Sequence, residues 1–444
     1  MMETAAALLD RCHARGASYA EAWIKTGATR AVTLEAGGGV SWSRSAEGGV
    51  ALRAVTADGR AGFASACGLE PSERTADALA AAALETAGSP WPAAAGPLPS
   101  GRLPDGRGFG IFDPRLHTAT CSDLEGLLDD AASEALRTEP RVRRLESACV
   151  TASSSEVWIA TSAGLTGTYR QTLLHVSLGV VAGVEGGSVV VRRTRTARSL
   201  SAFSPALFGD ETARLAATEL EGRPARAGIF PVLLAPVAAA ELLRLAARTL
   251  VMTAARIGAR VGPARLTLID DGRLPGGVST APFDGEGVAT RRTTLVARGQ
   301  AASTVHDLDS AAREGAASTG NGLRASFRDP PRRATSNLFI TPGNDAPEDL
   351  LAEMRGERAG LWIQSLRPTA ALLQAEGTVA ALAAGRWVDD GTPGAPVAGT
   401  LVMVPLDAWL DGIVGVGNDL MFGCTVGSFG SPSLLVRQME LRPA

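Results

Sequence analysis

The chain has 444 residues, of which 45% are hydrophobic and 20% charged, and its formal net charge is −3. This length allows two or three domains with substantial cores. The slightly acidic balance gives no reason to expect a nucleic-acid-binding surface, and the sequence contains no apolar run of roughly 18 residues that could form a transmembrane helix.

The cysteines and the N-terminus indicate a protein of the reducing cytoplasm. Five cysteines are scattered singly, at Cys12, Cys67, Cys121, Cys149 and Cys424. Without a CxxC pair, neither a thiol zinc cluster nor a disulfide framework is indicated. The first residues carry charges at Glu3, Asp10 and Arg11, so they lack the uninterrupted apolar core of a signal peptide. We therefore expect a cytoplasmic protein without a membrane association.

The first half of the chain predicts antiparallel strands accompanied by helices. Alternating apolar residues broken by Gly-Gly and Asp-Gly turns predict strands, and Ser or Thr before an apolar period of 3.6 predicts a helix start. In chain order we expect a helix over 3–15, a strand meander over 19–66, a helix that begins at Ser72 or Thr75 and ends before Gly88, a Pro- and Gly-rich loop over 89–107, a helix over 122–138 and long strands over 141–200.

The second half predicts a strand over 229–236, a helix over 237–258, a short helix over 348–355, and strands with Gly turns from 360 to 441. Helices and strands occur in blocks without a steady βαβ alternation, so the fold class is α+β. We expect two domains, 1–225 and 226–444, each with antiparallel sheets and flanking helices.

The four histidines limit the catalytic options. None has a partner at metal-ligand spacing, because HExxH, HxH and HxxxH are all absent. His13, His117 and His175 are therefore interpreted as structural. His306 is followed by Asp307, but neighbours in a strand point to opposite faces, so the two form a catalytic couple only if the backbone turns there.

Acidic residues near His306 leave three interpretations open. Asp284 and Glu286 lie in the glycine-rich segment "FDGEG", which is typical of a tight turn whose carboxylates cap backbone amides. A hard-cation site formed with Asp270 and Asp271 is a second interpretation. A hydrolase that uses Asp284, Glu286 and His306 is a third. The arginines of this stretch either pair with its acids, bind a peptide carboxylate, or form a solvated rim.

At residues 282–343 the chain resembles the TldD/PmbA family, whose second subunit type is called PmbA or TldE. The motifs that carry the resemblance are Asp284–Gly287, Thr290–Thr293, His306-Asp307, Ser318–Asn321 and Asn337–Gly343. The segments "GASYAEAWI" and "VGNDLMFG" near the two ends also look like their family counterparts. The resemblance implies a two-subunit cytoplasmic zinc peptidase that cleaves unstructured peptides, as in the maturation of precursor peptides.

The resemblance also implies which subunit this chain is. A TldD-type chain carries HExxxH on a helix and a third ligand from a C-terminal cysteine, whereas a TldE/PmbA-type chain has the same fold without the metal site. Here the motif positions hold Arg244, Leu245 and Thr249. Arginine and leucine do not ligate zinc, and leucine cannot deprotonate a metal-bound water. We therefore expect no cofactor in this chain and zinc in a partner subunit.

The function that we expect is that of a non-catalytic subunit in a heterodimeric zinc metallopeptidase, with no catalytic residues of its own. It would enclose the chamber and hold an unstructured peptide, in part by strand addition. The candidate substrate-binding residues are Thr319, Gly320, Asn321, Gly322, Arg291, His306 and Asp307. The alternative is a stand-alone peptide-binding or scaffold protein without hydrolytic activity.

Overall fold

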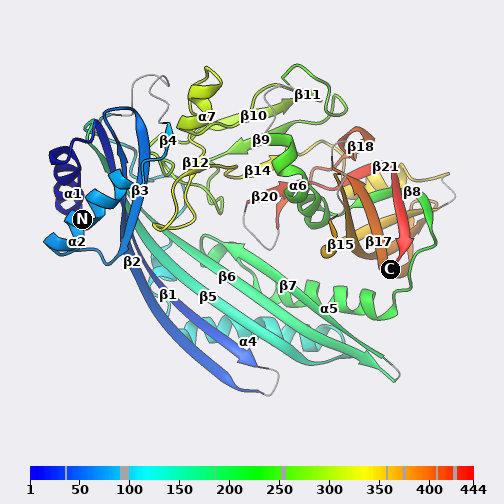
Figure 1. Ribbon diagram of the computed structural model, residues 1–444. Helices are drawn as coiled ribbons and strands as arrows, with labels where there is room; N and C mark the ends of the chain where they lie inside the picture. The colour runs from blue at the N-terminus through cyan, green and yellow to red at the C-terminus, as the bar shows by residue number, and fades with distance from the viewer. Residues whose placement is uncertain are drawn as a thin grey trace.

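The structure, a computed structural model, describes residues 1–35, 38–90, 100–185, 187–251, 257–356, 359–373, 377–406, 409–423 and 428–444. Figure 1 shows a long, curved sheet with helices along its outer side, and a strand-rich second half packed near the opposite side. In this view the C-terminus lies on the right, within the second half of the chain, and the N-terminus lies at the opposite end of the molecule, beside α1.

One large antiparallel sheet organises the first half of the chain. Its strands are β1 (Tyr19–Glu35), β2 (Val40–Val55), β3 (Arg60–Cys67), β4 (Ser89–Pro90), β5 (Val142–Thr161), β6 (Thr166–Val184) and β7 (Gly187–Ala197), in the order β4-β3-β2-β1-β5-β6-β7. The helices are α1 (Met2–Ala14), α2 (Glu73–Glu85), α3 (Pro114–Thr118), α4 (Cys121–Thr138) and α5 (Pro205–Glu221), with a 3₁₀ turn at Leu200–Ala202.

The two faces of this sheet differ in chemistry because side chains alternate along a strand. Along β1, the even positions Ala20, Ala22, Ile24, Val32 and Leu34 are buried in two clusters with the helices. One cluster joins the sheet to α1 and α2, and the other joins it to α4 and α5. The odd positions Glu21, Trp23, Lys25, Gly27 and Thr29 therefore face the opposite side, toward the second half of the chain.

Local sequence signals explain where the helices begin. Ser72 caps α2 by accepting a hydrogen bond of 3.2 Å from the backbone N–H of Thr75. Thr120 and Asp123 form a capping box at the start of α4. In α4 the buried residues Leu124, Leu128, Ala131, Ala132 and Ala135 recur every three or four positions, which forms an apolar stripe facing the sheet.

The second half contains two further sheets of six strands each and a short ribbon. The first sheet has the order β11-β10-β9-β14-β20-β19, and the second has the order β17-β16-β15-β8-β21-β18. An additional β17–β21 pairing closes five strands of the second sheet into a small barrel. The pairs β8–β15 and β14–β20 are parallel, whereas the other pairs in these sheets are antiparallel.

The elements of the second half have the following bounds: β8 (Gly228–Leu234), α6 (Pro236–Val251), β9 (Leu268–Asp271), β10 (Arg292–Ala297), β11 (Gln300–Ala301), α7 (Leu308–Arg313), β12 (Gly322–Leu323), β13 (Arg332–Arg333), β14 (Leu338–Ile340), α8 (Pro347–Ala352), β15 (Gly360–Leu373), β16 (Thr378–Asp389), β17 (Thr392–Pro405), β18 (Ile413–Val416), β19 (Met421–Phe422), β20 (Phe429–Ser431) and β21 (Leu434–Pro443), with a 3₁₀ turn at Trp409–Gly412. Strands β12 and β13 form the separate ribbon.

Helix α6 lies in the core of this second half. It packs Leu242, Leu243 and Ala246, all fully buried, into one hydrophobic cluster with barrel residues such as Leu361 and Val402. The cluster also includes residues of β9 and β14, so α6 links the barrel to the neighbouring sheet.

The structure confirms the α+β class and the antiparallel sheets with flanking helices. It also shows elements that we did not predict, among them α3, α5, α7 and the two parallel strand pairs. The helix predicted over 237–258 is described as far as Val251, and residues 252–256 lie outside the described ranges. The predicted boundary at 225/226 falls between α5 and β8 and stays a prediction.

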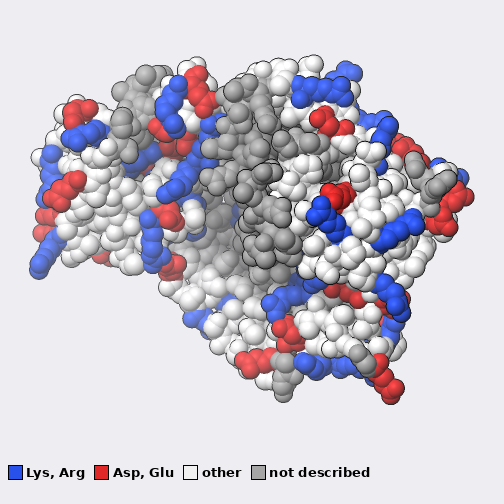
Figure 2. Space-filling view, turned by 45° about the vertical axis from the view of Figure 1, so that its right-hand side comes forward, with Lys and Arg blue, Asp and Glu red and all other residues white. Residues whose placement is uncertain are grey.

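On the face shown in Figure 2, acidic (red) and basic (blue) side chains are interspersed with one another. Within the described part of the chain, the helices are all too short or too polar to cross a membrane.

Candidate functional site

The "FDGEG" segment forms the tight turn predicted from its sequence. The Asp284 carboxylate accepts hydrogen bonds from the backbone N–H groups of Glu286 and Val288, both at 2.9 Å, and of Gly322 at 2.8 Å. Gly287 has a φ of +76°, a conformation that favours glycine. Burial and the nearby Glu286 raise the pKa of Asp284. Its carboxylate therefore has a structural role, because main-chain donors occupy both oxygens.

Glu286 belongs to a buried chain of alternating charges that connects the two halves of the molecule. Arg53 on β2 donates to Glu286 Oε1 at 2.8 Å and to Glu21 Oε2 at 2.6 Å. Arg324 donates to the other oxygen of Glu21 and to Gly285 O. Burial lowers the pKa of Arg53, but Glu21 and Glu286 raise it well above its usual value. The acids of this segment thus pair with arginines from other elements.

His306 and Asp307 do not form a catalytic couple. The backbone turns at this point because Asp307 is the N-cap of α7, where its Oδ1 accepts from Ser310 N at 2.8 Å and from Ser310 Oγ at 2.6 Å. His306 is 7% exposed, and its Nδ1 has no hydrogen-bond partner among the described residues. Burial, followed by the nearby Arg333, lowers the pKa of His306.

The "STGN" segment lies in a second buried network. Thr319 Oγ1 contacts Asn321 Oδ1 at 2.6 Å and His306 O at 3.0 Å, and Asn321 Nδ2 donates to Asp270 at 2.7 Å. Asp270 also accepts from the backbone N–H and the hydroxyl of Ser336. Burial raises the pKa of Asp270 to about 6. These polar groups fix the path of the chain.

The structure therefore separates the seven candidate substrate-binding residues into two groups. Thr319, Gly320, Asn321, Gly322, His306 and Asp307 are buried, whereas Arg291 is exposed and donates to Ser318 O. Glycine is required at two of these positions for close packing. A Cβ on Gly320 would lie 2.7 Å from Ala289 O, and a Cβ on Gly322 would lie 2.4 Å from Glu286 Oε2.

Helix α6, on which the resemblance predicts the zinc motif of a TldD-type chain, carries an ion pair. Arg244 donates to both carboxylate oxygens of Glu241, with Nη2–Oε1 at 2.6 Å and Nε–Oε2 at 3.1 Å. Glu241 is 5% exposed, and Leu245 packs against the core cluster. The side chain of Thr249 and residue Cys424 lie outside the described part of the structure.

Acids, histidines and cysteines do not gather into a metal site in the described ranges, where no group of three or more such side chains could hold an ion. The four acids of the hard-cation interpretation are instead held by other partners. Asp270, Asp284 and Glu286 accept the hydrogen bonds given above, and Asp271 Oδ1 accepts from Arg273 N at 2.9 Å. This donor set does not fit a metal ion.

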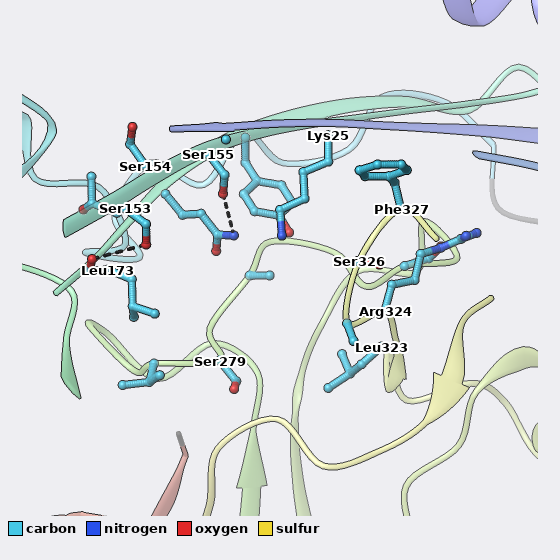
Figure 3. Close-up of a pocket in the computed structure, with 18 of the residues that line it drawn as sticks. Lys25, Ser153, Ser154, Ser155, Leu173, Ser279, Leu323, Arg324, Ser326 and Phe327 are labelled. Atoms are coloured by element: carbon cyan, nitrogen blue, oxygen red, sulfur yellow. Dashed lines mark hydrogen bonds between the residues drawn. The ribbon is translucent and has the colours of Figure 1, made fainter. Parts of the chain in front are cut away.

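A polar cavity of about 490 Å³ lies between the inner face of the large sheet and the segments 278–285 and 323–327. In Figure 3, Lys25 points from the sheet into this cavity, with Ser155 on one side and Phe327 on the other. Ser155 accepts a hydrogen bond of 3.0 Å from Gln171, and Ser153 donates to Leu173 O. We call this space the Lys25 cavity. Sequence analysis did not identify it.

Comparison with known proteins identifies related sequences. The family model of the PmbA/TldA metallopeptidase C-terminal domain matches residues 227–442, and that of the central domain matches residues 117–220. A metalloprotease of Methanocaldococcus jannaschii is 34% identical over 111 residues, a segment that covers 24% of each chain. A metalloprotease TldD homologue of Haemophilus influenzae is 24% identical over 380 residues, which cover 78% of this chain and 75% of the relative.

Solved structures share the whole fold. A putative modulator of DNA gyrase from Thermotoga maritima matches with a TM-score of 0.83 at 21% identity and covers 99% of this chain and 100% of its own. TldE from Thermococcus kodakarensis matches with a TM-score of 0.81 at 18% identity and covers 98% of both chains.

Proposed function

Because this chain belongs to the PmbA/TldD metallopeptidase family, we propose that it is the non-catalytic subunit of a heterodimeric zinc peptidase of the cytoplasm. A separate TldD-like chain supplies the zinc ion and the general base. This chain encloses part of the chamber and helps to hold an unstructured peptide substrate, such as a precursor peptide that is being matured.

The observation that carries this proposal is the Glu241–Arg244 pair on α6. A catalytic zinc site needs three protein ligands and an open position, and the ligands are His, Cys or carboxylate groups. At the first motif position Arg244 holds a guanidinium, whose positive charge repels a metal cation. Leu245, at the second position, has no group that accepts a proton. Glu241 is the nearest carboxylate on the helix, and its two oxygens are occupied by Arg244.

The buried roles of the "STGN" and "HD" residues change the proposal for substrate contact. Six of the seven candidate residues support the local fold, so we propose that they act indirectly, by holding the segments 278–285 and 323–327. Arg291 remains a candidate for direct contact because it is exposed. Two domains, 1–225 and 226–444, also remain part of the proposal, and the proposed boundary lies between the separate matches at 117–220 and 227–442.

The proposal is tested by peptide cleavage with separate and mixed chains. We expect an unstructured peptide to stay intact with this chain alone and to be cut when a paralogue that carries HExxxH is added, with products identified by mass spectrometry. The control is the same mixture with the motif glutamate of the paralogue replaced by glutamine. Chelator-sensitive cleavage by this chain alone would contradict the proposal. Peptide binding without cleavage in every mixture would favour the stand-alone binding protein.

A further inference from the structure

Lys25 is the sole lysine among the 43 basic residues of the chain, and it lies in the Lys25 cavity. It occupies an odd position of β1, so it projects from the face opposite the helices. Its side chain is half-buried, and its ammonium group makes no hydrogen bond or ion pair with any described residue. Burial lowers the pKa of Lys25, Glu47 raises it, and Arg198 lowers it. The cavity therefore contains an available ammonium donor.

Arg198 contributes a second positive charge to the same cavity. This guanidinium is 5% exposed, yet all its described hydrogen bonds go to neutral oxygens. It donates to Gly277 O at 3.2 Å, Gln171 Oε1 at 3.0 Å, Thr172 O at 3.1 Å and Thr280 O at 3.3 Å, and also to Val278 O. A buried charge is normally paired with an opposite charge. Within the described residues, Arg198 has no carboxylate partner.

The acids that line the cavity are already occupied. Glu47 pairs with Arg328 at the outer edge, and Asp284 accepts the three main-chain N–H groups described above. Arg324, the third basic residue of the lining, is neutralised by Glu21. Main-chain hydrogen bonds do not cancel the charge of an ionised Asp284, so Lys25 and Arg198 together against this one carboxylate leave a net excess of positive charge on the wall, which indicates an anionic ligand.

The shape of the cavity indicates what kind of anion enters it. Lys25 projects from a continuous antiparallel sheet, which closes the cavity on that side, so a peptide reaches the ammonium group from the open side with a terminal or a side-chain carboxylate. The Ser155 hydroxyl accepts a hydrogen bond from Gln171 and keeps its own proton to donate to a carboxylate. The rings of Trp23 and Phe327 can contact an apolar side chain of the same ligand. A volume of about 490 Å³ lies in the range of ordinary ligand sites.

We propose that the Lys25 cavity binds the C-terminal carboxylate of a peptide, with Lys25 as the direct donor and Arg198 as a fixed positive charge behind it. The peptide nature of the ligand rests on the proposed function, whereas the carboxylate chemistry rests on the cavity alone. An aspartate or glutamate side chain offers the same chemistry, so the experiment must distinguish a terminal from a side-chain carboxylate.

The test measures binding by fluorescence anisotropy, with the full-length chain alone and in its complex with an inactive HExxxH partner. Three labelled peptides are compared: Ala-Ala-Ala-Phe with a free carboxylate, its C-terminal amide, and an amidated peptide that ends in aspartate. We expect the free acid to bind about 10- to 100-fold more tightly than its amide, as for a charge-assisted hydrogen bond. Tight binding of the amidated aspartate peptide alone would assign the site to a side-chain carboxylate and overturn the terminal assignment.

Variants locate the effect at Lys25. Lys25→Met should remove the preference for the free acid, and Lys25→Arg should keep most of it. Arg44→Met is the matched control, since it removes one exposed positive charge of β2 outside the cavity. Thermal unfolding checks that each variant is folded. Three results would overturn the inference. They are equal binding of the acid and the amide by the wild-type chain, no binding by either the chain alone or its complex, and a preference for the acid that survives in Lys25→Met.

The single lysine allows a second measurement. An amine-specific label can react with two amines of the chain, the N-terminus and Lys25, and mass spectrometry after digestion separates them. The free acid should protect Lys25 and leave the N-terminus reactive. If the mixture cleaves peptides but Lys25 is not protected, the inference fails while the proposed function stands. If Lys25 is protected but no partner restores cleavage, the proposed function fails by itself.

Discussion

Arg53 on β2 and Glu286 in the second half of the chain are 233 residues apart in sequence, yet their side chains meet at 2.8 Å and both are buried. Glu21 and Arg324 extend this contact into a chain of four alternating charges. These four charged side chains hold the segments 278–285 and 323–327 against the sheet, and the two segments form one side of the Lys25 cavity. The position of the cavity therefore depends on ion pairs between the two halves.

Replacing Arg53 by methionine should strongly destabilise the protein. The substitution leaves Glu21 and Glu286 as buried carboxylates without their shared partner, which costs about 3–5 kcal/mol in comparable cases. The free energy of unfolding measured in urea is the test. The control is Arg313→Met, which removes an exposed i,i+4 pair with Asp309 and should change stability little. If both substitutions lowered the free energy of unfolding by the same amount, the buried ion pairs between the two halves would not be a major source of stability.

His306 should make stability depend on pH. Its pKa in the folded protein is below the ordinary value of 6.5, so the unfolded chain takes up a proton first as the pH falls. The stabilisation from His306 is complete above about pH 6.5 and is lost as the pH falls from there through the folded pKa. The groups that act on it are Arg333, Glu314, Asp307 and Arg291.

The variant His306→Gln isolates this contribution because glutamine does not titrate. The difference in unfolding free energy between wild type and variant should shrink as the pH falls from about 7.5 to about 5.5. NMR titration of the four histidines provides the direct value. A His306 pKa above 6.5 in the folded chain, or a constant difference across this range, would contradict the expected direction.

Gly320 should tolerate no side chain. Its φ is +75°, and a Cβ would lie 2.7 Å from the backbone oxygen of Ala289. Gly315 has a similar φ of +64°, but a Cβ added there would have no neighbouring atom within 4 Å. Gly315→Ala thus measures the backbone strain alone, about 1 kcal/mol. Gly320→Ala should cost clearly more, about 2 kcal/mol or more. Equal melting temperatures of the two variants would argue against the close contact.

His306 should also be unnecessary for peptide cleavage. It has no catalytic partner in Asp307, whose carboxylate is bound to Ser310, and it does not line the Lys25 cavity. A His306→Ala variant that folds should therefore support the same cleavage rate in the mixture with an HExxxH-bearing chain. A rate that fell by two orders of magnitude, with stability and complex formation retained, would return the non-standard hydrolase with Asp284 and Glu286 to consideration.

Local sequence signals predicted the parts of the fold that depend on neighbouring residues. Ser72 at the start of α2 and the capping carboxylate of Asp284 are contacts between residues a few positions apart, so the pattern contains them. The Asp307 cap is equally local, but the sequence analysis left open whether the backbone turns at His306 and Asp307, and the structure shows that it does. A capping residue followed three positions later by Ser310 was the signal that we missed.

The contacts that form the cavity could not be predicted in this way. Arg53, Glu286 and Arg324 come from distant segments, and no periodicity relates them. For Lys25 a signal did exist. It is the sole lysine of the chain and lies on the odd positions of β1, among residues that face away from the helices. Which surface covers that face depends on how the two halves pack, and this information became visible in the structure alone.

The central claim is that the zinc ion belongs to a partner chain. The most direct measurement is the zinc content of the purified chain, alone and after complex formation with its HExxxH-bearing paralogue. We expect no bound zinc in the chain alone and a single zinc ion per heterodimer. Stoichiometric zinc in the chain alone would contradict the assignment of the metal to the partner. Since neither Arg244 nor Leu245 can serve as a ligand, this chain would then bind zinc through other residues.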